Sequence, residues 1–199
     1  MQSSNRYAFP SVPRPAARAL GPDDPIRIGY LSGDLCTHAV GLLLAEVLAA
    51  HDRTAVETFA FEYSPQDGSA HRARLLGAFE HVHPVGALGD EQVAQLIQAC
   101  EIDVLVDLHG LSSGLRAGVL ALRPAPVQVT WLGFIGTTAM PWIDYVIGDH
   151  YTLPDALAPY FSEKFLRLDT CFLPADRQRY LEVPVRTRAD EGLPEAKGQ

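Results

Sequence analysis

The sequence predicts an α/β fold built on a Rossmann-like, mostly parallel sheet with helices on both faces. Two observations lead to this prediction. Short apolar runs rich in β-branched residues recur along the chain, and amphipathic stretches with helical spacing separate them. The first unit shows the pattern, because the apolar run 26–31 meets the turn Ser32-Gly33-Asp34 and a helical pattern then covers 40–50. A strand that turns tightly into a helix is the repeating unit of an open α/β sheet.

The remaining segments continue this alternation. A strong turn signal, SPQDGS at 64–69, separates the second strand from the second helix, and the run 102–108 is the clearest strand of all. We expect the following elements: strands at 55–63, 81–85, 102–108, 127–132, 143–148 and 165–168, and helices at 71–79, 89–100 and after the loop 109–114 through 121.

Three segments of different character divide the chain. Residues 1–24 contain four prolines and indicate a flexible lead-in or linker. Residues 25–175 carry the periodic pattern and form the Rossmann-like domain. Residues 176–199 are rich in arginine and broken by prolines, with no periodic apolar pattern, so we expect a linker there.

Composition excludes several classes of protein. A net charge of -8 argues against a general binder of nucleic acid or of anionic membranes. No apolar run reaches the roughly 18 residues of a membrane span, and the N-terminus lacks the apolar stretch of a secretory signal, so we expect a cytoplasmic protein. The three cysteines are far apart and form no CxxC pair. His81 and His83 share one strand face, but no third metal ligand lies nearby in sequence, so we expect no metal.

Three loops follow strands of the predicted sheet, near residues 32–40, 109–114 and 133–138. Ligands of open α/β sheets bind outside the carboxyl ends of the strands, so these loops are expected to form one site. Asp34 and His38 lie in the first loop, so two ionisable side chains are expected where this fold class carries its chemistry. The alternative is that Asp34 caps the following helix and that His38 is an ordinary surface residue. The second loop is rich in Gly and Ser and can hold a phosphate or sugar hydroxyls through its backbone N–H groups. These residues leave the reaction open.

One long stretch resembles a known family. Residues 122–138, LRPAPVQVTWLGFIGTT, resemble the LRPAPVQxxWLGYPGT signature of protein O-GlcNAc transferases and their SPINDLY-like bacterial relatives. Four further stretches follow the order of that family, namely RIGYLSGDLCTHAVG (27–41), SPQDGS (64–69), IDVLVDLHGLSSGLR (102–116) and YFSEKFLRL (160–168). The resemblance extends from about residue 26 to residue 194.

The resemblance implies the N-terminal half of a GT-B glycosyltransferase, whose site lies between two Rossmann-like halves. The C-terminal half, with most nucleotide-sugar contacts, is then missing, and the isolated chain is expected to be inactive. The implied reaction is inverting transfer of a sugar from a nucleotide donor, UDP-GlcNAc or another, to Ser or Thr of an acceptor protein, without cofactor or metal. The implied site residues are His38 and Asp34 as catalytic groups, and Leu132, Gly133, Ser112, Ser113 and Arg116 around donor and acceptor.

Two departures from the family pattern leave the identity of the donor sugar undecided. His38-Ala39-Val40 stands where His-Pro-Thr is usual, and Phe134-Ile135-Gly136 stands where Tyr-Pro-Gly is usual. SPINDLY-type relatives include O-fucosyltransferases that use GDP-fucose, so fucose is an alternative to GlcNAc. A non-catalytic Rossmann-like binding module is a second alternative. A small α/β hydrolase or nucleotide-binding domain is a third, although we expect neither a GxSxG elbow nor a GxGxxG or Walker loop in this chain.

Overall fold

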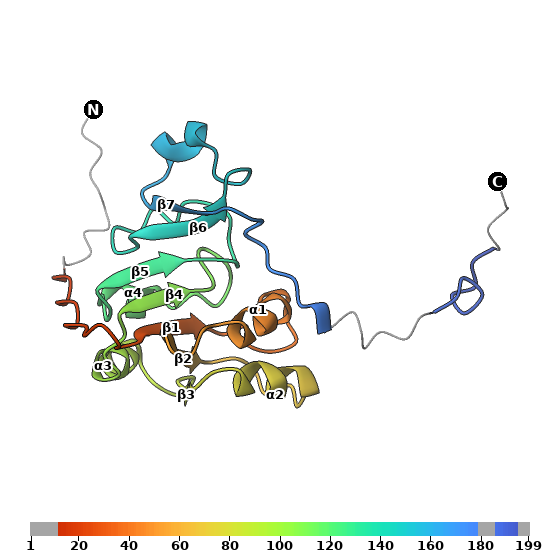
Figure 1. Ribbon diagram of the computed structural model, residues 1–199, viewed down its shortest axis with the longest axis horizontal. Coiled ribbons are helices and arrows are strands. Elements are labelled where there is room, and N and C mark those ends of the chain that lie inside the picture. Colours follow the sequence, from red (N-terminus) through yellow and green to blue (C-terminus); the bar gives the residue numbers. More distant parts are fainter. Residues whose placement is uncertain (1–11, 179–185, 195–199) are drawn as a thin grey trace.

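The computed structural model describes residues 12–178 and 186–194 and contains one sheet of seven parallel strands in the order β3-β2-β1-β4-β5-β6-β7 (Figure 1). The Rossmann-like fold expected from the sequence is confirmed. The elements are β1 Ile26–Ser32, α1 Ala39–Ala49, β2 Val56–Glu62, α2 Ala70–Gly77, β3 His81–Pro84, α3 Asp90–Ala99, β4 Val104–Asp107, α4 Ala117–Ala121, β5 Val127–Thr130, β6 Tyr145–Asp149, the 3-10 helix Asp155–Tyr160 and β7 Lys164–Leu168.

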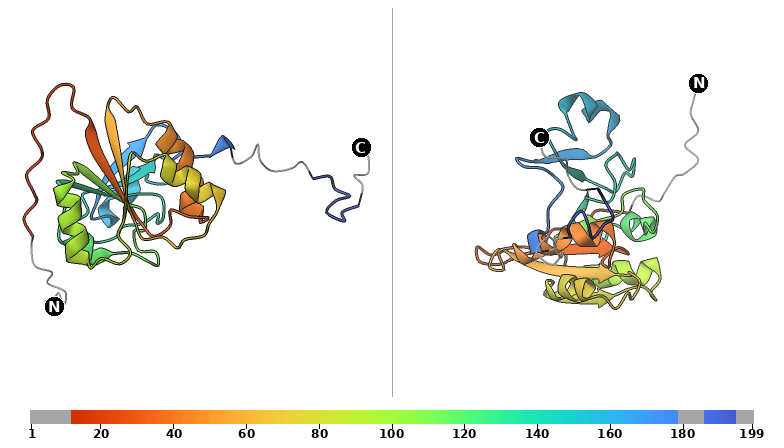
Figure 2. Two further views of the ribbon diagram at one scale, coloured as in Figure 1. Left: turned by 90° about the horizontal axis from the view of Figure 1, so that it is seen from below. Right: turned by 90° about the vertical axis from the view of Figure 1, so that its right-hand side faces the viewer.

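Helices lie on both faces of the sheet, so the core is split into two apolar layers (Figure 2). On one face, α1 and α2 pack against β1 and β2 through a cluster that includes Leu44, Leu48 and Leu75. On the other face, α3 and α4 bury Ile97 and Leu120 against the sheet. Strand order reverses beside β1, because the chain goes from β1 outward to β3 and then returns to β4 on the other side. This reversal places the carboxyl ends of β1 and β4 next to each other, where open α/β sheets bind their ligands.

Local signals explain where the helices begin. Ser69 caps α2, with its Oγ accepting the N–H of Arg72 at 3.0 Å. Asp90 and Glu91 lie in the first turn of α3, where negative charge favours the positive end of the helix dipole. The sequence prediction extended β5 to residue 132, but the strand ends at Thr130. The reason is the backbone of Leu132, whose φ of 75° is incompatible with a strand.

Residues 12–24 contain no helix or strand, yet two arginines fasten them to the sheet. Arg18 donates to the carboxylate of Asp103 at 2.9 Å and to the Pro25 carbonyl at 2.6 Å, and Arg14 pairs with Asp144. The domain boundaries at 24/25 and 175/176 stay predictions, since residues 1–11, 179–185 and 195–199 lie outside the described part of the chain. None of the helices that the structure describes is both long and apolar enough to cross a membrane.

Part of one sheet face is not covered by any helix that the structure describes. An apolar groove of about 460 Å³ runs from α1 across the strands β1, β4, β5, β6 and β7. Val106, Val129 and Ile147 lie on its floor, and Val47 and His51 of α1 line it too. Parallel sheets are almost always covered on both faces. The groove is the region of this sheet that departs from that rule.

A pair of substitutions tests this asymmetry. Leu105 is fully buried between the sheet and the helices α3 and α4, whereas Leu166 is 44% exposed beside the groove. Leu105→Ala is expected to lower the free energy of unfolding by about 2–5 kcal/mol, and Leu166→Ala by less than about 1 kcal/mol. Urea unfolding of both variants measures the difference. A cost for Leu166→Ala that matches the cost for Leu105→Ala, and that grows with protein concentration, would show that the groove is covered in solution.

Candidate functional site

The turn after β1 brings two ionisable side chains to the carboxyl edge of the sheet. Gly33 leaves β1 so close to Tyr63 that a Cβ atom would lie 2.7 Å from the tyrosine ring. The backbone N–H of Asp34 donates to the Oγ of Ser32 at 3.0 Å, which bends the chain away from the strand. The Asp34 carboxylate then lies between two imidazoles, with Oδ2 3.5 Å from Nδ1 of His38 and 3.5 Å from Nδ1 of His109.

His38 occupies the N-cap position of α1, and its side chain is half exposed. Its Nδ1 atom has two competing partners, the backbone N–H of Val40 at 3.4 Å and the Asp34 carboxylate at 3.5 Å. The first partner donates to Nδ1, whereas the second accepts a proton from it, so one nitrogen cannot serve both at once. When Nδ1 carries its proton toward Asp34, Nε2 is unprotonated and basic. Among the described residues Nε2 has no hydrogen-bond partner, so it is available to a ligand.

His109 is a site residue that the sequence prediction left out of the catalytic set. It is 1% exposed, and its Nε2 atom accepts the N–H of Gly33 at 2.9 Å. The proton of the neutral ring is therefore on Nδ1, which lies 3.1 Å from the carbonyl oxygen of Ser113. Burial lowers the pKa of His109, while the nearby Asp34 carboxylate opposes that shift. His109 thus joins the first and second loops as a neutral group beside Asp34.

The second loop reads Gly110-Leu111-Ser112-Ser113-Gly114, which fits the GxSxG pattern of α/β hydrolases, so the expectation that the chain lacks this pattern is wrong. The geometry does not support that chemistry. The Oγ atom of Ser112 and the Asp34 carboxylate both approach Nδ1 of His109, at 3.3 and 3.5 Å, whereas a triad needs them on opposite nitrogens. Ser112 is therefore placed as a partner of His109. Ser113 contributes its backbone carbonyl, and its side chain lies on an exposed part of the loop.

The third loop starts with a strained backbone. Leu132 has a φ of 75°, and the N–H of Gly133 donates to the carbonyl of Trp131 at 2.9 Å, which closes a tight turn. A Cβ atom on Gly133 would lie 2.0 Å from the carbonyl oxygen of Leu108. The third loop consequently touches the second loop one residue before His109. Strain of this kind clusters at functional sites, where surrounding contacts maintain it.

Arg116 was expected near donor and acceptor, but its guanidinium binds other parts of the protein. It pairs with Asp90 at 2.6 Å and donates to the carbonyls of Val85 at 3.1 Å and Leu88 at 2.8 Å. It also lies over the ring of Tyr63, 5.6 Å from the ring centroid. This placement makes Arg116 a support for the second loop and its helix rather than a free cation.

Asp107 ends β4 and shapes the loop that carries His109. Its two carboxylate oxygens accept the N–H groups of His109 at 3.2 Å and of Gly110 at 2.8 Å. The side chain is almost completely buried, and burial raises the pKa of Asp107 to about 6. The carboxyl group therefore keeps its proton in the folded chain at pH values where the unfolded chain has already lost it.

Asp107→Asn tests this shift through the pH dependence of stability. Folding favours the protonated carboxyl, so its contribution to stability is largest below about pH 4 and is lost as the pH rises toward 6. The difference in unfolding free energy between wild type and Asp107→Asn should therefore fall by about 3 kcal/mol over this range, at about 1.4 kcal/mol per pKa unit. Urea unfolding from pH 4 to 7 measures the difference. A difference that is constant with pH would contradict the shifted pKa.

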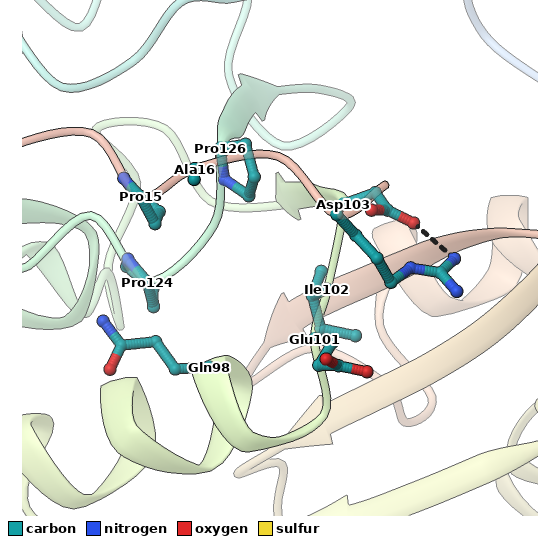
Figure 3. A pocket seen from close by; sticks show the side chains of 9 residues that line it. Pro15, Ala16, Gln98, Glu101, Ile102, Asp103, Pro124 and Pro126 are labelled. Carbon is teal, nitrogen blue, oxygen red and sulfur yellow. Dashed lines mark hydrogen bonds and ion pairs between the residues drawn. The ribbon is translucent and has the colours of Figure 1, made fainter. Parts of the chain in front are cut away.

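A separate cavity lies at the opposite, amino-terminal edge of the sheet. It is lined by prolines of the lead-in and of the segment before β5, and by the side chain of Gln98 (Figure 3). Its cation, Arg18, is already paired with Asp103. We assign this cavity to the seam between residues 12–24 and the sheet. Across the described ranges, no group of three or more His, Cys, Asp or Glu side chains is placed to hold a metal ion.

Comparison with known proteins identifies the family of this arrangement. Residues 10–190 match glycosyl transferase family 41. The chain belongs to this family. It is 33% identical to the probable UDP-N-acetylglucosamine–peptide N-acetylglucosaminyltransferase SEC of Arabidopsis thaliana, over 98% of this chain and 21% of SEC. It is 34% identical to the Caenorhabditis elegans UDP-N-acetylglucosamine–peptide N-acetylglucosaminyltransferase, over 78% of this chain and 14% of that protein.

A solved structure extends the family likeness to three dimensions. A mutant of the O-GlcNAc transferase of Thermobaculum terrenum is 40% identical and superimposes with a TM-score of 0.77, over 85% of this chain and 32% of that chain. The family expected from the signature at 122–138 is confirmed. This family 41 chain spans about a fifth of the length of SEC and a third of the solved chain, so it corresponds to one part of the longer relatives.

Proposed function

We propose that this family 41 chain forms one half of the active site of a protein O-glycosyltransferase that transfers a sugar, with inversion, to Ser or Thr of an acceptor protein. One observation carries the proposal: the Asp34 carboxylate lies 3.5 Å from Nδ1 of a half-exposed His38 at the carboxyl edge of the sheet. A carboxylate that holds a proton on Nδ1 leaves Nε2 as a base, which is the arrangement general base catalysis requires.

In the proposed reaction the acceptor hydroxyl oxygen bonds to the anomeric carbon of the donor. The bond from that carbon to the diphosphate oxygen breaks, and the hydroxyl proton passes to Nε2 of His38 or to the donor phosphate. Attack on the face opposite the leaving group inverts the anomeric centre. Asp34 stabilises the cationic imidazole that results. Leu132 and Gly133 would line the sugar pocket, and Ser112 and Ser113 would lie at the acceptor edge.

The donor in this proposal is UDP-GlcNAc, a choice supported by the names of the relatives from Arabidopsis thaliana and Caenorhabditis elegans. GDP-fucose is the competing donor. We further propose that a second half supplies most nucleotide contacts, because the described loops near Asp34 offer no free arginine or lysine for a diphosphate. A cytoplasmic location is part of the same proposal, and fractionation of cells that express the protein tests it.

A chimeric enzyme tests the function. Residues 26–178 would replace the matching segment of the Thermobaculum terrenum enzyme, which is 40% identical. The chimera is expected to glycosylate a peptide acceptor with UDP-GlcNAc, and faster than with GDP-fucose. Calorimetry of the 199-residue chain with UDP-GlcNAc, UDP and GDP-fucose is expected to show no binding until a C-terminal half is added. A folded chimera that binds the donor but transfers nothing would favour the non-catalytic binding module.

A further inference from the structure

A buried ion pair lies behind the turn that carries Asp34 and His38. Glu62 ends β2 and Arg72 lies in the first turn of α2, and the two residues are 3% and 4% exposed. Arg72 Nη2 donates to Glu62 Oε2 at 3.1 Å. Taking two charges out of water is costly, and an apolar pair of similar size is often at least as stable. A buried ion pair is favourable only when its remaining donors and acceptors also form hydrogen bonds. The partners in those hydrogen bonds show which part of the chain the pair fixes in place.

The further bonds converge on one peptide unit. Arg72 Nη1 donates to the carbonyl oxygen of Leu35 at 2.6 Å. The backbone N–H of Leu35 donates to the Oγ of Ser64 at 2.8 Å, and the N–H of Ser64 donates back to Glu62 Oε2 at 3.1 Å. Glu62, Ser64 and Arg72 therefore form a closed ring that holds both polar backbone atoms of Leu35. We call this ring the Leu35 clamp.

The clamp holds one of the three residues that lie between the two proposed catalytic groups. Leu35 follows Asp34 directly and precedes His38 by three positions, and its side chain is fully buried in the core. The far end of the turn is held separately, because the N–H of Thr37 donates to the Asp67 carboxylate at 2.7 Å. With both ends held, little freedom remains in the separation of Asp34 from His38. None of the three clamp side chains is hydrogen-bonded to either of them.

We propose that Glu62, Ser64 and Arg72 are positioning residues that hold Asp34 and His38 in register for transfer, a role that rests on the proposed function. A loose turn would let the 3.5 Å contact between Asp34 and His38 open, and displacements of about 1 Å in an active site can cost about a hundredfold in rate. Arginine is required because one guanidinium reaches both Glu62 and Leu35, whereas a lysine ammonium is a single point charge.

Three variants separate positioning from simple stability. Ser64→Ala removes the acceptor of the Leu35 N–H but leaves the ion pair intact. Arg72→Lys keeps the charge but loses one of the two contacts. Arg27→Lys is the matched control, because Arg27 pairs with Glu57 and Glu101 at the other end of the same sheet. Hydrogen exchange of the Leu35 and Thr37 amides in the 199-residue chain, the melting temperature, and kcat and KM of the chimera are the readouts.

Ser64→Ala and Arg72→Lys are expected to speed exchange of the Leu35 amide at least tenfold relative to amides of β4. In the chimera they should lower kcat at least tenfold with little change in the KM for the donor, while Arg27→Lys changes neither quantity. Unchanged kcat despite faster Leu35 exchange, or a loss that follows the melting temperature in all three variants, would overturn the proposal. If the unsubstituted chimera is inactive, the proposed function fails, and slow Leu35 exchange in Ser64→Ala would separately show that no clamp exists.

Discussion

Replacing His38 with alanine in the chimera is expected to reduce sugar transfer by about 10²–10⁴-fold, the usual contribution of a general base. The reason is that Nδ1 of His38 faces the Asp34 carboxylate, which leaves Nε2 as the basic nitrogen, and Nε2 has no hydrogen-bond partner among the described residues. The same substitution also removes the cap of α1, since in the competing tautomer Nδ1 accepts the N–H of Val40. Loss of a helix cap costs about 1 kcal/mol of stability. A lower transfer rate in His38→Ala alone could therefore come from the missing base or from the less stable fold.

His38→Asn separates the two effects. An asparagine at the N-cap position accepts the same backbone N–H but cannot take up a proton at neutral pH. Both variants are therefore expected to lose transfer to the same extent, while only His38→Ala lowers the melting temperature. Initial-rate kinetics and thermal unfolding of the two proteins measure this. Transfer that survives in His38→Asn would show that the histidine acts only as the cap of α1, a role that the sequence alternative had given to Asp34.

The fold was predictable because its information is local. The spacing of apolar residues in segments such as 26–31 and 40–50 sets strand or helix before any tertiary contact forms. The end of β5 was not predictable from spacing, since the apolar pattern runs on to Leu132 and only the contact between Gly133 and Leu108 requires the chain to turn. The apolar groove was also not predictable from the sequence. Its existence depends on which connections between strands contain a helix that packs on that face of the sheet.

The position of the candidate site could be predicted from the sequence, but the predicted set of catalytic residues did not include His109. Asp34 and His38 could be selected because they follow the first strand, where open α/β sheets bind ligands. His109 follows a strand in the same way, and that position was the available signal. Its role depends on the N–H of Gly33, more than seventy residues away in sequence, which fixes the proton on Nδ1. Arg116 shows what the sequence position could not reveal, because a cation near a site can also pair with a partly exposed carboxylate such as Asp90.

The second large effect is expected at Gly133. In Gly133→Ala the new Cβ would lie 2.0 Å from the carbonyl oxygen of Leu108, a backbone atom that cannot move independently. The strand end must shift, at a cost of about 2–3 kcal/mol for overpacking. The shift would be transmitted to His109, the next residue after Leu108, and so to the Asp34 carboxylate. Transfer by the chimera should fall about a hundredfold, because the proposed catalytic groups lose their alignment.

Gly77→Ala provides the matched control for Gly133→Ala. Gly77 ends α2, and a Cβ atom there would meet nothing within 4 Å. Alanine favours the helix over glycine by up to about 1 kcal/mol, so this variant should be slightly more stable and fully active. Urea unfolding and transfer kinetics of the two variants give the comparison. If Gly133→Ala were as stable and as active as Gly77→Ala, the contact between the second and third loops would have no part in shaping the site.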